Sequence, residues 1–169
     1  TSFHDAGTSF AMVDTYKELA LKRELPVRLW VMLGETNRQL ARHMDEYRMV
    51  GVGDHHLTVR SVKRLIDGAL GSHGAWLLEP YDDLQTSRGL NTISPESLRQ
   101  TAGLAVDHGF QLCVHAIGDR ANREVLDIYE QAFKAVSGNR DLRWRIEHAQ
   151  HLHPDDIPRF SQLGVVAAM

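Results

Sequence analysis

Residues 110–119 read FQLCVHAIGD, an apolar run that ends on His115 before a small residue and a turn. Residues 142–150 read LRWRIEHAQ and show the same pattern, with an apolar-rich run that ends on His148 before a small residue. A stretch with helical spacing lies between the two runs. Repeated strand and helix units indicate a parallel sheet, and the carboxyl ends of parallel strands meet at the face where ligands and metals bind. The pattern therefore predicts two imidazoles at one rim, which is a candidate metal site.

The rest of the chain extends this alternation. Strand-like runs are expected at residues 1–4, 27–33, 57–66, 110–115 and 142–148, and a sixth follows Gly164. Apolar spacing and end signals predict helices over residues 9–24, 36–49, 94–108, 119–136 and 154–163. Residues 69–93 are Gly-rich and show no period, which is typical of a long functional or mobile loop. The fold class is therefore α/β with a parallel sheet.

Two architectures fit six parallel strands. One is a complete doubly wound, flavodoxin-like binding domain, with helices on both faces of an open sheet. The other is a partial (β/α)₈ TIM barrel, since a whole barrel takes about 250 residues and this chain has 169. The chain starts on Thr1 as if a strand were already running, and an apolar strand runs to Met169. Domain boundaries usually fall in polar linkers, so we expect residues 1–169 to be a single partial barrel domain, truncated at both ends.

Composition excludes several classes of protein. A net charge of −3 with mixed signs gives no basic surface for nucleic acid. No apolar run approaches the roughly 20 residues of a membrane span, and no signal peptide opens the chain. The single cysteine, Cys113, excludes an internal disulfide, and its place in an apolar run predicts a small buried side chain. These features favour a reducing, cytoplasmic location.

Four residue positions could carry chemistry. His115 and His148 are either metal ligands through neutral imidazole nitrogens or hydrogen-bonded strand ends. Lys63 lies inside the third run. It could face a solvated rim, pair with an acid, or react as a neutral amine with carbon dioxide to form a carbamate ligand. The plainer alternative is a lysine side chain turned to solvent. Asp119 is either a helix N-cap or a group that orients a ligand from behind. No phosphate-binding glycine motif and no nucleophile elbow is found.

Four segments in order resemble the amidohydrolase superfamily, over essentially the whole chain. They are residues 1–7 (TSFHDAG), 62–72 (VKRLIDGALGS), 114–122 (VHAIGDRAN) and 145–150 (RIEHAQ). The chain is most similar to the YtcJ-like metal-dependent hydrolases, a group that includes N-substituted formamide deformylases. The resemblance implies a (β/α)₈ barrel with a metal centre at its carboxyl rim, and the six runs then correspond to strands two to seven.

The resemblance also implies roles for particular residues. Lys63 matches the carboxylated lysine of strand four, His115 the histidine of strand five, and His148 the histidine of strand six. These residues would hold one or two divalent ions, with zinc the expected metal, while Asp67 and Asp119 would lie behind them. The family's His-x-His of strand one, its Asp of strand eight and its flanking β-sandwich have no counterpart in these residues. Arg64 and His73-Gly74 also depart from the group's pattern, which loosens any inference about the substrate.

The resemblance implies a hydrolase of non-peptide, amide-like carbon–nitrogen bonds that takes a small-molecule substrate. Because half of the family's ligands are not among these residues, we expect the 169-residue chain alone to be inactive, to bind metal weakly or not at all, and to self-associate through exposed sheet edges. A non-catalytic binding or regulatory relative of the barrel is the alternative within this family.

Overall fold

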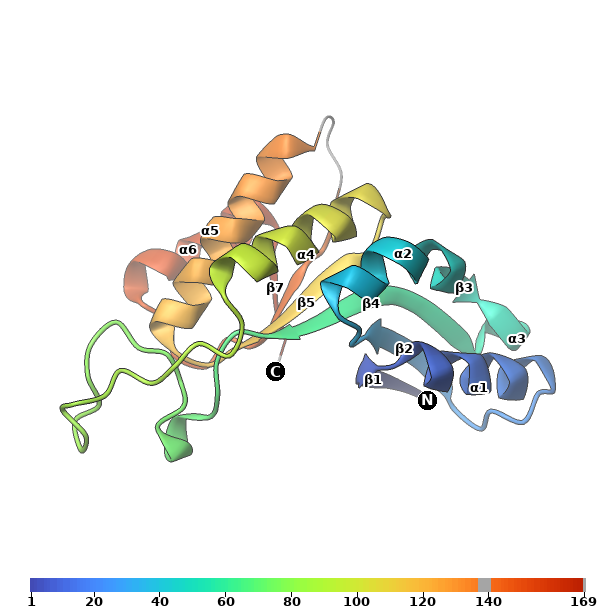
Figure 1. Cartoon of the computed structure of the whole chain (residues 1–169), viewed down its shortest axis with the longest axis horizontal. Coiled ribbons are helices and arrows are strands. Elements are labelled where there is room, and N and C mark those ends of the chain that lie inside the picture. The colour runs from blue at the N-terminus through green and yellow to red at the C-terminus, as the bar shows by residue number, and fades with distance from the viewer. Residues whose placement is uncertain (137–140, 169) are drawn as a thin grey trace. The chain divides into compact units, whose positions relative to one another are not determined.

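The computed structural model describes residues 1–136 and 141–168, and strands and helices alternate along them (Figure 1). The strands are β1 (Ser2–Thr8), β2 (Arg28–Leu33), β3 (Met49–Gly51), β4 (Leu57–Leu65), β5 (Gln111–Ala116), β6 (Arg145–His148) and β7 (Val166–Ala168). The α-helices are α1 (Phe10–Leu21), α2 (Asn37–Tyr47), α3 (Val52–His55), α4 (Pro95–Asp107), α5 (Asp119–Ala135) and α6 (Ile157–Leu163). Short 3₁₀ turns occupy η1 (Leu70–Ser72) and η2 (Pro154–Asp156). All six expected runs are strands, and the five expected helices are present.

The sheet follows chain order, β1-β2-β4-β5-β6-β7, and the short strand β3 pairs antiparallel with β4. Strand β2 lies between β1 and β4 and is parallel to both. In a flavodoxin-like sheet the first strand would lie between the second and the third parallel strands. The flavodoxin-like alternative is therefore wrong, and the chain has the strand order of a partial (β/α)₈ barrel.

The chain divides into two compact units, which are described separately. The first comprises Thr1–Lys63 and Leu104–Leu112, and the second comprises Arg64–Gly103 and Cys113–Met169. In the first unit, the Ser9 hydroxyl accepts from the Met12 amide at the start of α1, and Thr36 forms a capping box with Gln39 at the start of α2. Its core is apolar, with Val13, Val31, Leu33, Leu40, Met44, Leu57 and Val59 fully buried.

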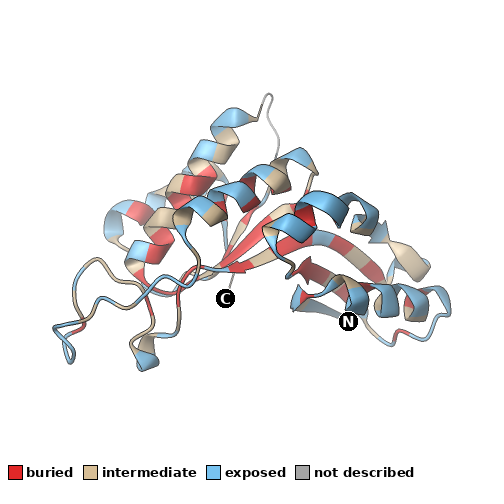
Figure 2. Cartoon of the chain, viewed as in Figure 1, coloured by how far each residue is buried: buried red, intermediate tan, exposed pale blue. Residues whose placement is uncertain are grey.

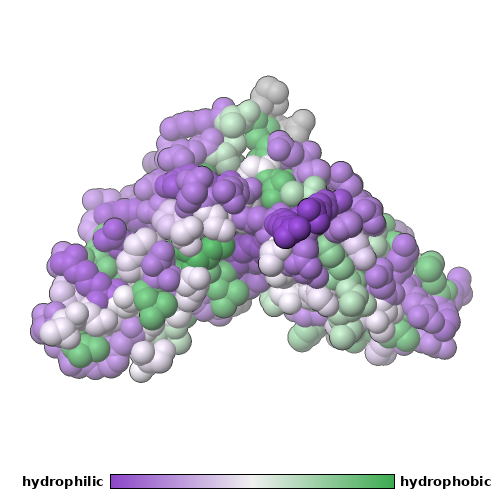
Figure 3. All heavy atoms as spheres, in the orientation of Figure 1, coloured by the Kyte–Doolittle hydropathy of each residue, from purple (hydrophilic) through white to green (hydrophobic). Residues whose placement is uncertain are grey.

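The core of the second unit lies between α5 and the strands β5 and β6 (Figure 2). One stripe of α5 carries Ala121, Val125 and Tyr129, all fully buried, as its apolar spacing predicts. Cys113 is fully buried, so the expectation of a small core side chain is confirmed. The outer faces of the helices in view in Figure 3 are mostly hydrophilic. No helix within residues 1–136 and 141–168 has the length and apolar character that crossing a bilayer requires.

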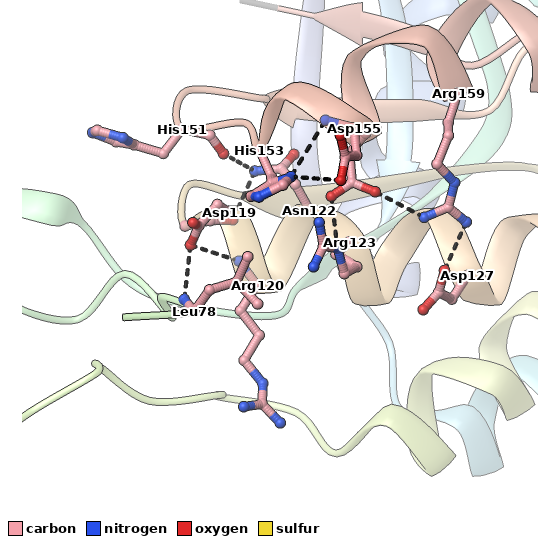
Figure 4. A network of polar contacts seen from close by, with 12 residues as sticks. Leu78, Asp119, Arg120, Asn122, Arg123, Asp127, His151, His153, Asp155 and Arg159 are labelled. Atoms are coloured by element: carbon pink, nitrogen blue, oxygen red, sulfur yellow. Dashed lines mark hydrogen bonds and ion pairs between the residues drawn. The ribbon is translucent and has the colours of Figure 1, made fainter. Parts of the chain in front are cut away.

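An ion-pair network centred on the buried Asp156 joins α5 to the η2–α6 segment (Figure 4). Asp156 is 2% exposed, and its carboxylate accepts from Arg123 Nε at 2.8 Å and from Arg159 Nη1 at 3.0 Å. Arg159 Nη2 also reaches Asp127 and Glu130 on α5, at 2.6 and 3.1 Å. Because each buried charge has a partner of opposite sign, the network fixes the segment after β6 against the helix after β5.

Tyr129 gives a testable dependence of stability on pH. Burial raises the pKa of its hydroxyl well above the usual value, while the unfolded chain keeps a tyrosine pKa of about 10. The folded state therefore favours the neutral phenol. Its contribution to stability is complete below pH 10 or so and is lost progressively as the pH rises further.

We expect the free energy of unfolding to fall between neutral pH and about pH 11, and to fall less steeply in Tyr129→Phe, which cannot ionise there. Urea titrations across this range measure both slopes. The variant is also expected to be less stable at neutral pH, because the Tyr129 hydroxyl donates to the Arg145 carbonyl at 2.9 Å. If the free energy of unfolding fell equally steeply with pH in both proteins, the raised pKa of Tyr129 would be contradicted.

Candidate metal centre

The structure places the two predicted histidines side by side. His115 lies one residue before the end of β5, and His148 is the last residue of β6. The two strands are parallel, with Ala116 paired to His148. The ring centroids are 4.7 Å apart, and the ring planes meet at 76°. Adjacent parallel strands thus bring two imidazoles to one rim, as the spacing in the sequence predicts.

The backbone at the second histidine is in a conformation that L-residues rarely adopt. His148 has φ +75° and Ala149 has φ +42°. Each such residue costs on the order of 1–3 kcal/mol unless its surroundings hold it, and such residues cluster at functional sites. No sequence signal marks this feature, because neither position is a glycine.

A buried carboxylate lies behind His115. Asp67 has a side chain that is 0% exposed, and its Oδ1 is 3.5 Å from His115 Nε2. The strand geometry explains this approach, because the Ile66 amide donates to the His115 carbonyl at 3.1 Å and Asp67 follows at once. The same carboxylate accepts three backbone N–H groups, from Ile117 and Gly118 at 3.0 and 2.8 Å and from Trp76 at 3.0 Å.

Asn122 holds the same turn from its other side, and it was not predicted from the sequence. The residue is fully buried, and its Nδ2 lies within 3.4 Å of the carbonyls of Ala116, Ile117, Gly118 and His151 (Figure 4). The available signal was a polar residue on the buried stripe of α5, next to Ala121. Asp67 and Asn122 together fix the chain that follows His115.

Asp119 is not the N-cap of α5, which was one of the two roles expected for it. The N-cap of α5 is Gly118, so the N-cap assignment is wrong by one residue. Asp119 occupies the first turn, where an acid is favoured by the helix dipole, and its Oδ1 accepts from the Leu78 and Arg120 amides, both at 2.9 Å (Figure 4). Asp119 thereby ties residues 69–93 to α5.

Residues 69–93 form an ordered loop with a small core of its own. Ala75, Tyr81 and Ile117 are buried together, and Leu70 and Leu77 pack against them. The Tyr81 hydroxyl donates to the Ala75 carbonyl at 2.8 Å, and the Arg120 guanidinium lies 4.7 Å from the centre of the Trp76 ring. This loop is attached to the turn after His115 by Asp67 and by Asp119.

Gly118 is where the loop passes closest to that turn. A Cβ at this position would lie 2.0 Å from the Trp76 carbonyl oxygen, so the loop backbone would have to move. We expect Gly118→Ala to lower the free energy of unfolding by about 1–3 kcal/mol, as overpacking does. Urea unfolding measures the loss. Gly71→Ala is the control, because a Cβ there meets nothing within 4 Å; equal losses in the two variants would contradict the role of close approach.

Lys63 lies near the carboxyl end of β4, half-buried between the buried residues Val62 and Arg64. It belongs to the first unit, whereas His115 and His148 belong to the second. Arg64 donates from Nε to the Thr101 hydroxyl at 3.2 Å. A metal role for Lys63 therefore stays a prediction from the resemblance.

His115 and His148 offer donor atoms of a type that divalent metals bind. Imidazole nitrogens suit zinc and its neighbours in the first transition row, and metal-binding histidines commonly have a carboxylate behind them, as His115 has Asp67. Protein zinc sites use at least three protein ligands, and residues 1–136 and 141–168 contain no cluster of three His, Cys, Asp or Glu side chains that could hold an ion. Two imidazoles alone do not make up a complete donor set for zinc.

Comparison with known proteins decides the family. The model of the amidohydrolase family matches residues 1–169. The chain belongs to the amidohydrolase family. Among solved structures, this amidohydrolase chain is similar to an uncharacterized metal-dependent hydrolase from Pyrococcus furiosus, with a TM-score of 0.79 and 27% identity. That match covers 98% of this chain and 33% of the other, and it supports a divalent metal in this fold.

Curated relatives of this amidohydrolase chain carry different names. Protein LONG AFTER FAR-RED 3 of Arabidopsis thaliana is 36% identical over 99% of this chain and 27% of its own length. The YtcJ protein of Bacillus subtilis (strain 168) is 34% identical over 62% and 19%. The exoenzymes regulatory protein AepA of Pectobacterium carotovorum is 26% identical over 64% and 22%. The chain spans about a fifth to a quarter of the length of these relatives.

Proposed function

We propose that the full-length protein is a metal-dependent hydrolase of non-peptide, amide-like carbon–nitrogen bonds in small molecules. The observation that carries the proposal is the pair of rings of His115 and His148, 4.7 Å apart at the carboxyl ends of adjacent strands. Family membership supports hydrolysis, and the similar metal-dependent hydrolase supports a divalent ion. The bond type comes from the sequence resemblance to formamide deformylases.

The residues of this chain would act as ligands and as a frame. His115 and His148 would hold one ion, which we propose is zinc, and a carbamate role for Lys63 remains what the family resemblance implies. A bound divalent ion supplies a hydroxide nucleophile near neutral pH and polarises the substrate carbonyl. Asp67 and Asn122 hold the turn after His115 rigid, and precise placement of reacting groups is worth several kcal/mol in an enzyme.

Turnover of N-formyl amines and simple amides by the purified full-length protein tests the proposal. We expect hydrolysis that is lost when a chelator strips the metal and is restored by zinc or another divalent ion. Hydrolysis that continues after metal analysis shows the protein to be metal-free would contradict it.

A non-catalytic, regulatory relative is the second candidate, and a specific observation favours it. The AepA relative is named as a regulatory protein. A regulator predicts no turnover of any amide by the full-length protein, and a biological effect that survives replacement of both histidines. An enzyme predicts loss of function in the same variants.

We also propose that residues 1–169 alone are inactive and self-associate. Within the described residues β1 pairs with β2 and β7 pairs with β6, so each has one strand edge available to another chain. Phe3 on β1 is 62% exposed and Val166 on β7 is 42% exposed, which adds apolar surface at both strands. Sedimentation of the purified 169-residue chain should show oligomers, and a stable monomer would contradict this.

A further inference from the structure

Asp67 makes two kinds of contact, one with the backbone and one with the ring of His115. Its carboxylate accepts three backbone N–H groups, and it also lies 3.5 Å from the ring of His115. Oδ1 receives the Ile117 amide, and Oδ2 receives the Gly118 and Trp76 amides. With both oxygens held in this way, the carboxylate cannot rotate away from the imidazole without breaking hydrogen bonds in a fully buried place.

The contact between Asp67 Oδ1 and His115 Nε2 bears on the tautomer of His115. Both oxygens of the Asp67 side chain accept backbone N–H groups, so this side chain presents acceptors to His115 and favours the tautomer that carries its proton on Nε2. The lone pair of that tautomer is on Nδ1. The 3.5 Å approach of Asp67 Oδ1 to His115 Nε2 is not a hydrogen bond in this structure, and such contacts often tighten when a site is filled.

We propose that Asp67 is a positioning residue that fixes the tautomer and orientation of His115, so that Nδ1 is the nitrogen that binds the metal. The proposal deepens the function proposed above and rests on it. Asp67 also carries the link to the loop, because the same carboxylate holds the Trp76 amide. Asp67 would then couple metal binding to the order of residues 69–93, beside the second link that Asp119 makes to the loop.

The first test is the zinc affinity of full-length Asp67→Asn, measured by competition with a chromogenic chelator. Asparagine keeps the size of the side chain but replaces one acceptor oxygen by an NH₂ group, which cannot accept a backbone N–H. We expect zinc affinity to fall about 10- to 100-fold, as when the outer partner of a metal-binding histidine is removed. Unchanged affinity would overturn the proposal.

Tyr81→Phe is the matched control for damage to the loop. It removes one buried hydrogen bond, from the Tyr81 hydroxyl to the Ala75 carbonyl, and leaves Asp67 untouched. We expect a lower thermal midpoint with wild-type zinc affinity. If Tyr81→Phe loses as much zinc affinity as Asp67→Asn, Asp67 acts only as a loop anchor and the proposal is overturned.

A second measurement needs no variant and so does not depend on the folding of Asp67→Asn. Long-range ¹H–¹⁵N spectra of the metal-free, histidine-labelled protein report which ring nitrogen of His115 carries the proton. We expect the Nε2–H form, and a dominant Nδ1–H form would overturn the proposal.

His115→Ala separates failure of this proposal from failure of the proposed function. If His115→Ala loses zinc affinity and Asp67→Asn does not, only the positioning role is wrong. If neither variant changes zinc affinity, the metal centre itself is wrong.

Discussion

Replacement of His115 or His148 by alanine is expected to abolish metal-dependent hydrolysis by the full-length protein. The two rings are 4.7 Å apart and would share one ion, so the loss of either would remove one of its ligands. A catalytic metal supplies several kcal/mol of transition-state stabilisation. We therefore expect kcat/KM to fall by about 10³-fold or more in each variant, measured with the best N-formyl amine or amide substrate.

The double variant and a surface control sharpen this result. Because the two histidines act as a unit, removing both should cost about as much as removing one. His43→Ala should keep wild-type activity, since that ring is on α2, exposed and paired with Glu46. Additive losses from His115 and His148, or wild-type turnover in either single variant, would show that the two residues do not share an ion.

Trp144→Ala is expected to cause a large loss of stability. The indole is fully buried just before β6, with ring centroids of Tyr129 and Phe133 at 4.9 and 5.1 Å. Deleting such a side chain leaves a cavity between α5 and β6 in addition to the lost burial. We expect the free energy of unfolding to fall by about 3–5 kcal/mol, measured by urea unfolding of the full-length protein with a probe in this domain.

Leu90→Ala is the control for Trp144→Ala. Leu90 is 54% exposed in the loop of the same unit, so its loss should change the free energy of unfolding by less than about 0.5 kcal/mol. A loss for Trp144→Ala no larger than that for Leu90→Ala would mean that the contacts around the indole do not stabilise this unit.

The sequence was most informative where one pattern repeats. Six apolar runs and the helices between them predicted the strands of the parallel sheet, because periodicity reports which side chains a regular element buries. Strand β3 was missed: it has three residues, and its register with β4 is the single pair Met49–Val59. A strand that short leaves no alternation to detect.

The sequence predicted which two histidines would meet, and it did not predict the residues that hold the turns around them. Ending two neighbouring strands on histidine predicted that His115 and His148 meet. The left-handed backbone of His148 and the four carbonyls around Asn122 depend on how distant segments pack, and no local pattern encodes them. Asp67 was a candidate from its place in a motif, but its three backbone partners come from a turn and a loop that only the fold brings together.

Anomalous diffraction at the zinc absorption edge, from crystals of the full-length protein grown with zinc, tests the central claim most directly. We expect an anomalous peak with a ring nitrogen of His115 and one of His148 about 2.0–2.1 Å away. Zinc bound elsewhere, or no peak beside these rings at saturating zinc, would contradict it.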